Sequence, residues 1–202
     1  MTQPLAFITG ASSGIGQALA LRFHQAGYRL ALVARRTAEV KSWAEANGIS
    51  ASSYEIYSAD VAITDSIVAA GKDCLARQGL PDVVIANAGV SIGMDTAVRE
   101  DIDVMTRLFA TNNIGLAATF HPFVAGMTAR GSGALVGIAS VAAIRGLPGH
   151  AAYCASKAAV VAYCESLRGE CRGQGVSVVT LLPGYVATQL TARNPYPMPF
   201  LM

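Results

Sequence analysis

Six short apolar runs, separated by longer helical patterns, constrain the fold of this chain more than any other feature. The runs are rich in Val, Ile and Leu, and most are apolar without a break, which is typical of strands that are buried on both faces of a parallel sheet. They occupy residues 5–9, 29–34, 53–59, 82–87, 133–140 and 176–182. The helical patterns between them occupy residues 14–26, 37–47, 64–78, 98–129 and 151–173.

This alternation predicts an α/β fold, a doubly wound parallel sheet of the Rossmann type with right-handed crossovers. Six strands fit the order 3-2-1-4-5-6, in which ligands bind at the carboxyl ends of the strands. The third run is more polar than the others, as expected of an edge strand. Residues 1–202 are the length of a single domain. The last residues, "NPYPMPFLM" (194–202), are broken by prolines and predict an irregular segment.

The composition narrows the classes of partner. Apolar residues make up 52% of the chain, which is enough for a large core, while the net charge is only +2 and no basic run occurs. Nucleic acid and anionic membrane are therefore poor partners. No apolar run has the length of a membrane-spanning helix, and the start "MTQPLAFITG" lacks the pattern of a signal peptide, so we expect a cytoplasmic protein. The four cysteines and three histidines lack metal-ligand spacing, which predicts no metal site and buried or unreactive thiols.

A glycine-rich stretch, "TGASSGIG" (9–16), follows the first predicted strand and opens the first predicted helix. Gly10, Gly14 and Gly16 would allow a tight turn and let a pyrophosphate approach the helix N-terminus, where free N–H groups and the helix dipole favour an anion. The strand before the stretch and the helix after it are the context that a dinucleotide site requires. The alternative is a glycine-rich turn that serves only tight packing.

The second predicted strand ends in "LVARR", which carries no acidic residue. An NAD site of this type uses an acid near this position to bind the ribose 2′-hydroxyl. An arginine suits a 2′-phosphate instead, because its forked donors match phosphate oxygens. The sequence therefore predicts NADP as the cofactor, with NAD as the alternative, and Arg35 ahead of Arg36 as the 2′-phosphate ligand. Two solvated arginines leading into a helix are the other interpretation.

A phenol and an ammonium group lie four residues apart in "YCASKAAV" (153–160), within a predicted helix. Residues spaced i and i+4 share a helix face, so Tyr153 and Lys157 can point into one cleft. A lysine cation about 4 Å from a phenolate would stabilise it by roughly 4 kcal/mol, or about three pK units, as an upper bound because burial opposes the effect. The spacing thus predicts that Lys157 brings the pKa of Tyr153 towards neutrality. Ser140, at the end of the fifth run, could hold a carbonyl oxygen beside the phenol, although a serine that only satisfies a strand end is an alternative.

Taken together, the motifs resemble the short-chain dehydrogenase/reductase family. They follow the family's order and cover nearly the whole chain. The matching stretches are "TGASSGIG" (9–16), "DV" (60–61), "NAG" (87–89), "TNNIG" (111–115), Ser140, "YCASK" (153–157) and "PGYVAT" (183–188).

The resemblance implies a role for each matching residue. Tyr153 would be the catalytic acid/base, Lys157 would hold the nicotinamide ribose and acidify Tyr153, and Ser140 would position the substrate oxygen. Asn112, rather than Asn113, matches the asparagine of the proton relay, because it stands three residues before a glycine. The implied catalytic set is Asn112, Ser140, Tyr153 and Lys157, and the implied cofactor-binding set is Gly10, Ser12, Ser13, Gly14, Ile15, Gly16, Arg35, Arg36, Asp60, Val61, Asn87, Ala88, Gly89, Tyr153, Lys157, Pro183, Gly184, Val186 and Thr188.

The function implied by the resemblance is hydride transfer between NADP(H) and a small-molecule carbonyl or alcohol. We expect an apolar substrate pocket formed by residues 91–94 and 141–147, and a homodimer or homotetramer that packs through the helices at 98–129 and 151–173. Two alternatives remain: a cofactor-binding paralogue without catalysis, acting as a sensor or structural protein, and, less in keeping with the glycine spacing, a sugar-nucleotide epimerase or dehydratase.

The sequence departs from the family pattern at two places. Ala86 stands where a second asparagine or similar polar residue is usual before "NAG". The sequence also ends soon after "PGYVAT", whereas family members continue with a substrate-covering segment, another helix and a seventh strand. We therefore expect a domain that is cut short at its C-terminus and a sixth strand whose apolar side chains lose their cover.

Overall fold

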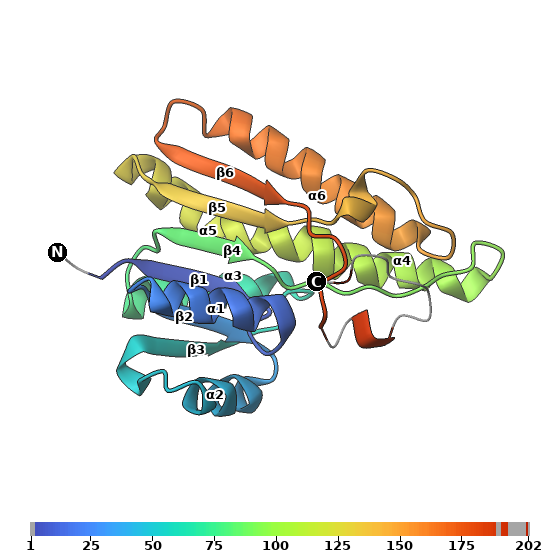
Figure 1. The fold of residues 1–202 in the computed structure, drawn as a ribbon. Helices are drawn as coiled ribbons and strands as arrows, with labels where there is room; N and C mark the ends of the chain where they lie inside the picture. The colour runs from blue at the N-terminus through green and yellow to red at the C-terminus, as the bar shows by residue number, and fades with distance from the viewer. Residues whose placement is uncertain (1–2, 189–190, 194–200, 202) are drawn as a thin grey trace.

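The computed structural model describes residues 3–188, 191–193 and 201, and it contains one six-stranded parallel sheet (Figure 1). The order of its strands confirms the predicted 3-2-1-4-5-6 arrangement of a doubly wound sheet. Residues 194–200 and 202 of the predicted irregular tail lie outside the described residues. The strands are β1 (Leu5–Thr9), β2 (Arg29–Ala34), β3 (Tyr54–Ser58), β4 (Val83–Ala86), β5 (Gly133–Ile138) and β6 (Val176–Leu181).

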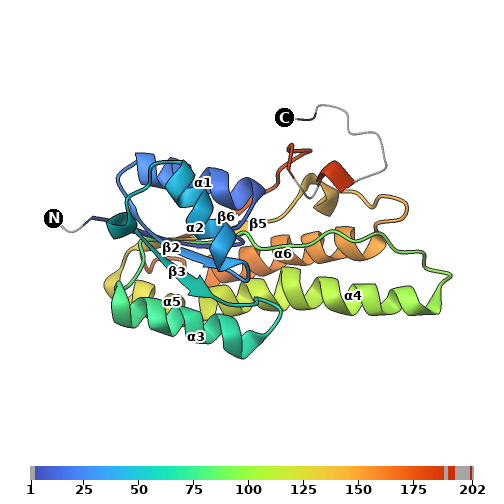
Figure 2. The same cartoon turned by 90° about the horizontal axis from the view of Figure 1, so that it is seen from below.

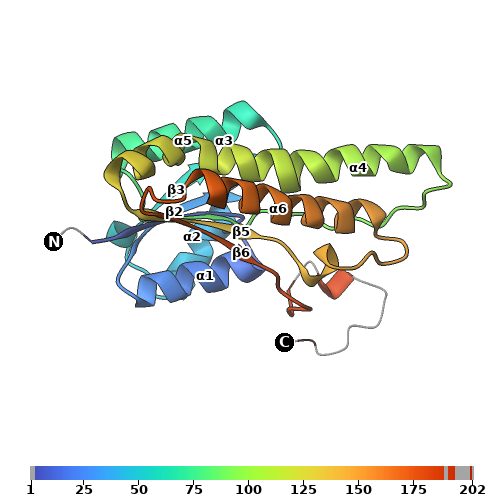
Figure 3. The same cartoon turned by 90° about the horizontal axis from the view of Figure 1, so that it is seen from above.

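Helices cover both faces of the sheet, as Figures 2 and 3 show from opposite sides. The helices α1 (Gly14–Gln25) and α2 (Thr37–Ala46) lie on one face, and α3 (Thr64–Arg77), α4 (Ile102–Phe109), α5 (Gly115–Arg130) and α6 (Ala151–Glu170) lie on the other. Neighbouring residues of β1 illustrate the two resulting cores. Phe7 packs on the α5 side with its ring centroid 4.8 Å from that of Phe123, while Ile8 joins a separate buried cluster that contains Val40 of α2.

The helix predicted over residues 98–129 is divided in the structure. A short 3₁₀ turn (Arg99–Asp101) precedes α4, and a π-helical turn, η3 (Ala110–Ile114), joins α4 to α5. A π turn adds a residue to the helical turn and is common at functional sites. It leaves the apolar pattern of the sequence nearly unchanged, which is why the sequence predicted one continuous helix instead of two helices joined by a π turn.

The last strand of the sheet, β6, presents apolar side chains to solvent on one face. Val179 and Leu181 are 39% and 42% exposed, whereas Val178, on the other face, is buried against α6. Within the described residues β6 pairs only with β5, and the guanidinium of Arg168 donates through Nε to the carbonyl oxygen of Val178 at 2.9 Å. The expectation that this strand exposes apolar side chains is confirmed for these residues.

None of the helices in the described ranges is both long enough and apolar enough to cross a membrane.

Candidate active site

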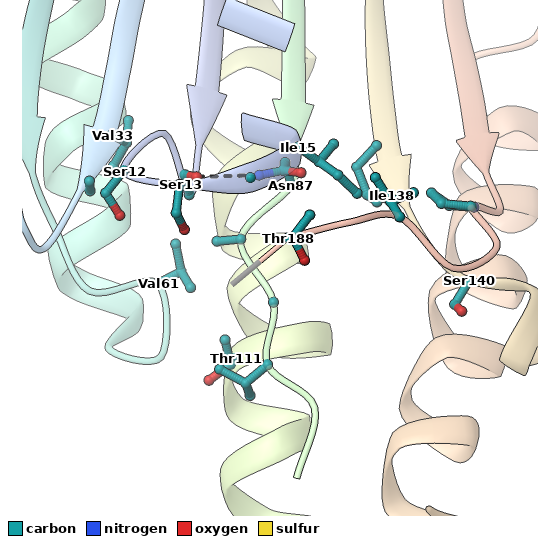
Figure 4. A pocket seen from close by; sticks show the side chains of 18 of the residues that line it. Ser12, Ser13, Ile15, Val33, Val61, Asn87, Thr111, Ile138, Ser140 and Thr188 are labelled. Carbon is teal, nitrogen blue, oxygen red and sulfur yellow. Dashed lines mark hydrogen bonds between the residues drawn. The ribbon is translucent and has the colours of Figure 1, made fainter. Parts of the chain in front are cut away.

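A pocket lies at the carboxyl ends of the strands, where the arrows of Figure 4 end. It is lined by the segments that follow all six strands. The fold therefore gathers the predicted residues as the strand order requires. Every residue predicted as catalytic or cofactor-binding lines the pocket except Gly16 and Asn112. Those that line it are Gly10, Ser12, Ser13, Gly14, Ile15, Arg35, Arg36, Asp60, Val61, Asn87, Ala88, Gly89, Ser140, Tyr153, Lys157, Pro183, Gly184, Val186 and Thr188.

The glycine-rich loop has the backbone geometry that its glycines predict. Gly10 and Gly14 have φ angles of 70° and 55°, in the left-handed region that favours glycine. A Cβ atom on Gly16 would lie 2.2 Å from the carbonyl oxygen of Gly10, so this position allows helix α1 to pack against the loop. The first turn of α1 has no acidic residue, so its N-terminal N–H groups and dipole face the pocket without a competing anion from that turn.

The turn after β4 is fastened to the glycine-rich loop by Thr9, which was not predicted as a site residue. The hydroxyl of Thr9 accepts hydrogen bonds from the backbone N–H groups of Asn87 and Ala88, each at 3.1 Å. The Asn87 amide in turn donates to the carbonyl oxygen of Thr9 at 2.9 Å, and Figure 4 shows this side chain reaching toward the loop. Thr9 is the first residue of the glycine-rich stretch, but the sequence analysis predicted it only as the last residue of a strand.

Two arginines reach the pocket from the end of β2. Arg35 pairs with Asp60 at 3.4 Å, across the ends of β2 and β3. Arg36 donates to the hydroxyl of Ser12 in the glycine-rich loop at 3.1 Å and pairs with Glu39 at 3.0 Å. Both guanidinium groups therefore border the space between the glycine-rich loop and the second strand, and each is already held by an oxygen acceptor.

Tyr153 and Lys157 lie on one face of α6, but the ammonium group does not meet the phenol oxygen. The Nζ atom lies 5.9 Å from the centre of the Tyr153 ring and donates to the carbonyl oxygen of Ile138 at 2.8 Å. Lys157 is only 5% exposed, and burial lowers its pKa to about 8. The lysine therefore holds its proton weakly for a side chain of this type.

The predicted lowering of the Tyr153 pKa by Lys157 is wrong for this arrangement. Burial raises the pKa of the phenol, and a hydrogen bond with the Ser140 side chain only partly offsets this effect. Helical spacing correctly placed the two residues on one face, but Lys157 is directed to a backbone carbonyl of β5 instead of the phenol. Burial then decides the balance, because desolvation disfavours the phenolate.

Ser140 follows β5 and faces the pocket (Figure 4). Its hydroxyl also accepts the backbone N–H of Ala142 at 3.2 Å, which caps the short 3₁₀ turn η4 (Val141–Ala143). The serine thus satisfies a strand end, as one interpretation of the sequence held. It also lies in the same pocket as Tyr153, as the other interpretation held.

Asn112 supports the pocket wall from behind. Its Oδ1 accepts the backbone N–H of Val90 at 2.9 Å, and its Nδ2 donates to the Val90 carbonyl oxygen at 3.0 Å and to the Ser156 hydroxyl at 2.9 Å. The side chain is buried, and its neighbour Thr111 lines the pocket in its place. Asn112 thereby connects the segment after β4 with helix α6.

The segment after β6 crosses back over the glycine-rich loop. Thr188 lies so close that a Cβ atom on Gly14 would be 3.1 Å from its methyl carbon. Thr191, which was not predicted, fastens this segment: its hydroxyl donates to the carbonyl oxygen of Val186 at 2.6 Å and accepts the N–H of Thr188 at 2.9 Å. In the sequence, the only feature that could have indicated a role for Thr191 is its position shortly after the "PGYVAT" motif. The pocket residues missed by the sequence analysis are Val33, Ala34, Ala59, Val90, Thr111, Ile138, Ala139 and Thr191, most of them at strand ends.

The segments predicted to contact substrate lie side by side beyond Ser140. The N–H of Met94 donates to the carbonyl oxygen of Gly149 at 2.9 Å, which joins the segment after β4 to the loop before α6. Val141, Ile144 and Leu147 are exposed on that loop. None of residues 91–94 and 141–147 lines this pocket, contrary to the prediction that they form it. Val141, Ile144 and Leu147 instead make an exposed apolar rim on the segment that follows the pocket residue Ser140.

All four cysteines are free and buried, as the sequence predicts. Burial raises the pKa of the Cys74 thiol to about 12, so this thiol is unreactive at neutral pH. In residues 3–188, 191–193 and 201, no cluster of three or more His, Cys, Asp or Glu side chains is arranged to hold a metal ion.

Comparisons with known proteins give one consistent result. A family model described as "short chain dehydrogenase" matches residues 4–197. An "Uncharacterized oxidoreductase" of Myxococcus xanthus is 40% identical over 205 residues, covering 100% of this chain and 79% of the relative. A putative NAD(P)-dependent gluconate 5-dehydrogenase from Beutenbergia cavernae with bound NADP superimposes with a TM-score of 0.87 at 33% identity, over 95% of this chain and 76% of that one. A short-chain dehydrogenase/reductase from Burkholderia phymatum in complex with NAD gives 0.86 at 27% identity, over 94% and 68%.

Several other curated relatives are longer, and the chain spans 57–61% of their length. The family match covers nearly all of this chain, and both its fold and its motifs agree with it. The chain therefore belongs to the short-chain dehydrogenase/reductase family.

Proposed function

We propose that this oxidoreductase is NADP(H)-dependent and interconverts a carbonyl compound and an alcohol, with Tyr153 as the acid/base. The observation that carries the proposal is one pocket that joins a glycine-rich dinucleotide loop to Ser140, Tyr153 and Lys157. The loop and these three residues come from distant parts of the chain, and a pocket that only bound a nucleotide would not require Ser140 and Tyr153.

The pocket fits a dinucleotide on structural grounds. The positive φ angles of Gly10 and Gly14 and the close packing at Gly16 create a cradle that side chains would fill. In this proposal the start of α1 holds the pyrophosphate, Asp60 and Val61 border the adenine, and the segment from Pro183 to Thr188 covers the nicotinamide. A bound nicotinamide cofactor supplies or accepts the hydride.

NADP is proposed ahead of NAD because the end of β2 supplies two guanidinium groups and no acid. Arg36 already contacts the glycine-rich loop through Ser12, and Arg35 lies across from it beside Asp60. A 2′-phosphate between them would receive charge-assisted hydrogen bonds. The B. cavernae protein binds NADP and the B. phymatum protein binds NAD, so the family as a whole does not decide the matter.

The residues of the chain suit proton transfer to a carbonyl oxygen. Because burial raises its pKa, Tyr153 is a phenol at neutral pH and can donate its proton to a substrate oxygen. Ser140 would hold that oxygen beside the phenol, and Lys157 would hold the nicotinamide ribose. In the opposite direction the same phenol oxygen would take the proton from an alcohol, which requires a higher pH.

The proposal extends to the assembly and the location of the protein. Four apolar side chains of α4, η3 and α6 are exposed, as expected of a surface that packs against a second copy: Ile102, Met105, Ile114 and Tyr163. We therefore propose a homodimer or homotetramer that acts in the cytoplasm. Its substrate would be a small apolar molecule that lies along the rim of Val141, Ile144 and Leu147.

A turnover screen tests it. Aldehydes, ketones and alcohols are offered with NADPH, NADH and their oxidised forms, and nicotinamide absorbance is followed. We expect reduction of apolar carbonyls with NADPH faster than with NADH. Tight NADPH binding without turnover of any substrate would instead support the non-catalytic paralogue, and absence of binding would refute the cofactor assignment.

A further inference from the structure

Two adjacent asparagines, Asn112 and Asn113, both bind Ser156 of helix α6. The Asn112 Nδ2 donates to the Ser156 hydroxyl at 2.9 Å, and the Asn113 Nδ2 donates to the Ser156 carbonyl oxygen at 2.9 Å. In a regular α-helix, successive side chains point about 100° apart, so neighbours rarely reach one target. Both asparagines lie in the π-helical turn η3, whose wider turn reduces that angle.

Ser156 is also connected to the backbone of the proposed catalytic tyrosine. Its hydroxyl, which is 0% exposed, donates to the carbonyl oxygen of Tyr153 at 2.8 Å. In an α-helix the same carbonyl accepts the N–H of Lys157, four residues on. A serine that bonds back to a carbonyl of the preceding turn changes the local bend of its helix. Ser156 therefore acts on the turn that carries both Tyr153 and Lys157.

The other end of this connection reaches the pocket wall. Asn112 is fixed by two hydrogen bonds to the backbone of Val90, which lines the pocket after β4. A continuous series of hydrogen bonds thus runs from Val90 through Asn112 and Ser156 to the backbone of Tyr153. Asn113 adds a second, independent attachment between η3 and the same turn of α6.

We propose that Ser156 and Asn113 are positioning residues, which hold the turn of α6 that carries Tyr153 and Lys157 at a set distance and tilt from the pocket wall at Val90. The inference rests on the proposed function, since it concerns the geometry of that reaction. Neither residue lines the pocket, so neither would touch cofactor or substrate. Their effect would appear in the rate of the chemical step, because small displacements of a catalytic group are costly there.

The cost of leaving a buried amide without its hydrogen-bond acceptor supports this role. Loss of the Ser156 hydroxyl would remove one acceptor of the buried Asn112 amide, which leaves that donor free to shift. The substitution Ser156→Ala removes only a single oxygen atom from the side chain. The substitution therefore tests the connection with little disturbance of packing.

The test compares Ser156→Ala with a matched control, Thr119→Val. Thr119 in α5 is 1% exposed, and its hydroxyl donates to the carbonyl oxygen of Gly115 at 2.7 Å, whereas within the described part of the chain no hydrogen bond joins it to α6. We expect Ser156→Ala to lower kcat about tenfold with KM for NADPH and for the carbonyl substrate within twofold, while Thr119→Val stays within twofold in all three. The midpoint of thermal unfolding is measured for both variants.

A second variant, Asn113→Leu, removes the other attachment and should lower kcat in the same way. A fall of less than threefold in kcat for Ser156→Ala, or an equal fall in Thr119→Val, would overturn the proposal. A loss that appears in KM alone would also overturn it, since that pattern indicates altered binding.

Hydrogen–deuterium exchange separates this inference from the proposed function. If the wild-type protein shows no turnover, the proposed function fails, but the attachment remains testable without substrate. Amides of the α6 turn at residues 153–160 should then exchange at least threefold faster in Ser156→Ala than in the wild type, and be unchanged in Thr119→Val. Unchanged exchange in Ser156→Ala would overturn the attachment itself.

Discussion

Replacement of Lys157 by methionine should change how the stability of the protein depends on pH. Burial lowers the pKa of Lys157 from 10.5 to about 8 in the folded protein, while the unfolded chain keeps the ordinary value. Between these two values the unfolded state binds one proton more than the folded state, so the free energy of unfolding rises with pH. Each pH unit contributes about 1.4 kcal/mol, and the span of 2.5 units (10.5 minus 8) contributes about 3 kcal/mol.

Urea unfolding of the wild type and of Lys157→Met at pH 7.5, 8.5, 9.5 and 10.5 measures this effect. The quantity to compare is the difference in the free energy of unfolding between the two proteins at each pH. Several other buried groups have raised pKa values, among them the Tyr153 phenol and the Cys74 thiol, and they oppose the trend above about pH 9. They occur in both proteins and therefore cancel in the difference.

The expected result is a difference that moves in favour of the wild type by up to about 3 kcal/mol between pH 8 and 10.5, and is constant below pH 7.5. The control is Lys41→Met, because Lys41 is an exposed lysine of α2 and pairs with Glu45 at 4.0 Å. The change with pH for Lys157→Met is judged against the change for this control. An equal change in both variants would refute the conclusion that burial governs the protonation of Lys157.

Three further predictions concern the pocket. Tyr153→Phe should remove nearly all turnover, because the proton carrier is lost. The dissociation constant for NADPH, measured by fluorescence titration, should stay within about threefold of the wild-type value. Substantial residual turnover would show that another group is the acid/base. Arg35→Asp should weaken NADPH binding tenfold or more, because charge-assisted hydrogen bonds are worth about 1.5–3 kcal/mol, and should leave NADH binding unchanged or improved. Arg36→Asp is the parallel variant. Equal losses for both cofactors would contradict the 2′-phosphate assignment. Gly16→Ala should weaken both cofactors at least tenfold with circular dichroism unchanged, because the added Cβ would meet the Gly10 carbonyl oxygen at 2.2 Å; unaltered affinities would show that the loop is not the pyrophosphate site.

The strands were predictable because burial on both faces of the sheet leaves a continuous apolar signal. The run at 29–34 coincides with β2 (Arg29–Ala34), and the run at 53–59 exceeds β3 (Tyr54–Ser58) by one residue at each end. The π turn at Ala110–Ile114 was not predictable in the same way. A single additional residue in a helical turn shifts the apolar pattern too little to be recognised, and the hydrogen bonds of Asn112 that accompany it join segments distant in the sequence.

The membership of the pocket followed from strand ends and motifs, but its electrostatics did not. Spacing shows that Tyr153 and Lys157 share a helix face, yet it cannot show which acceptor the ammonium group meets. That acceptor is a backbone carbonyl of Ile138, nineteen residues earlier in the chain, so no side-chain pattern marks it. The choice between Asn112 and Asn113 was similar: spacing to the glycine identified Asn112, while the contact of Asn113 with α6 came only from the structure.

The end of β5 contacts both titratable groups of the proposed reaction. The carbonyl oxygen of Ile138 holds the ammonium group of Lys157, and Ser140, two residues later, interacts with the phenol of Tyr153. Helix α6 must therefore lie close to β5, and Gly137 makes this approach feasible, since a Cβ atom there would lie 2.6 Å from the sulfur of Cys164. A side chain at Gly137 would push α6 away from the strand and lengthen both interactions at once. The close packing of Gly137 against the buried thiol of Cys164 thus keeps α6 near β5, where burial shifts the pKa values of Tyr153 and Lys157 and the end of β5 supplies a hydrogen-bond partner to each.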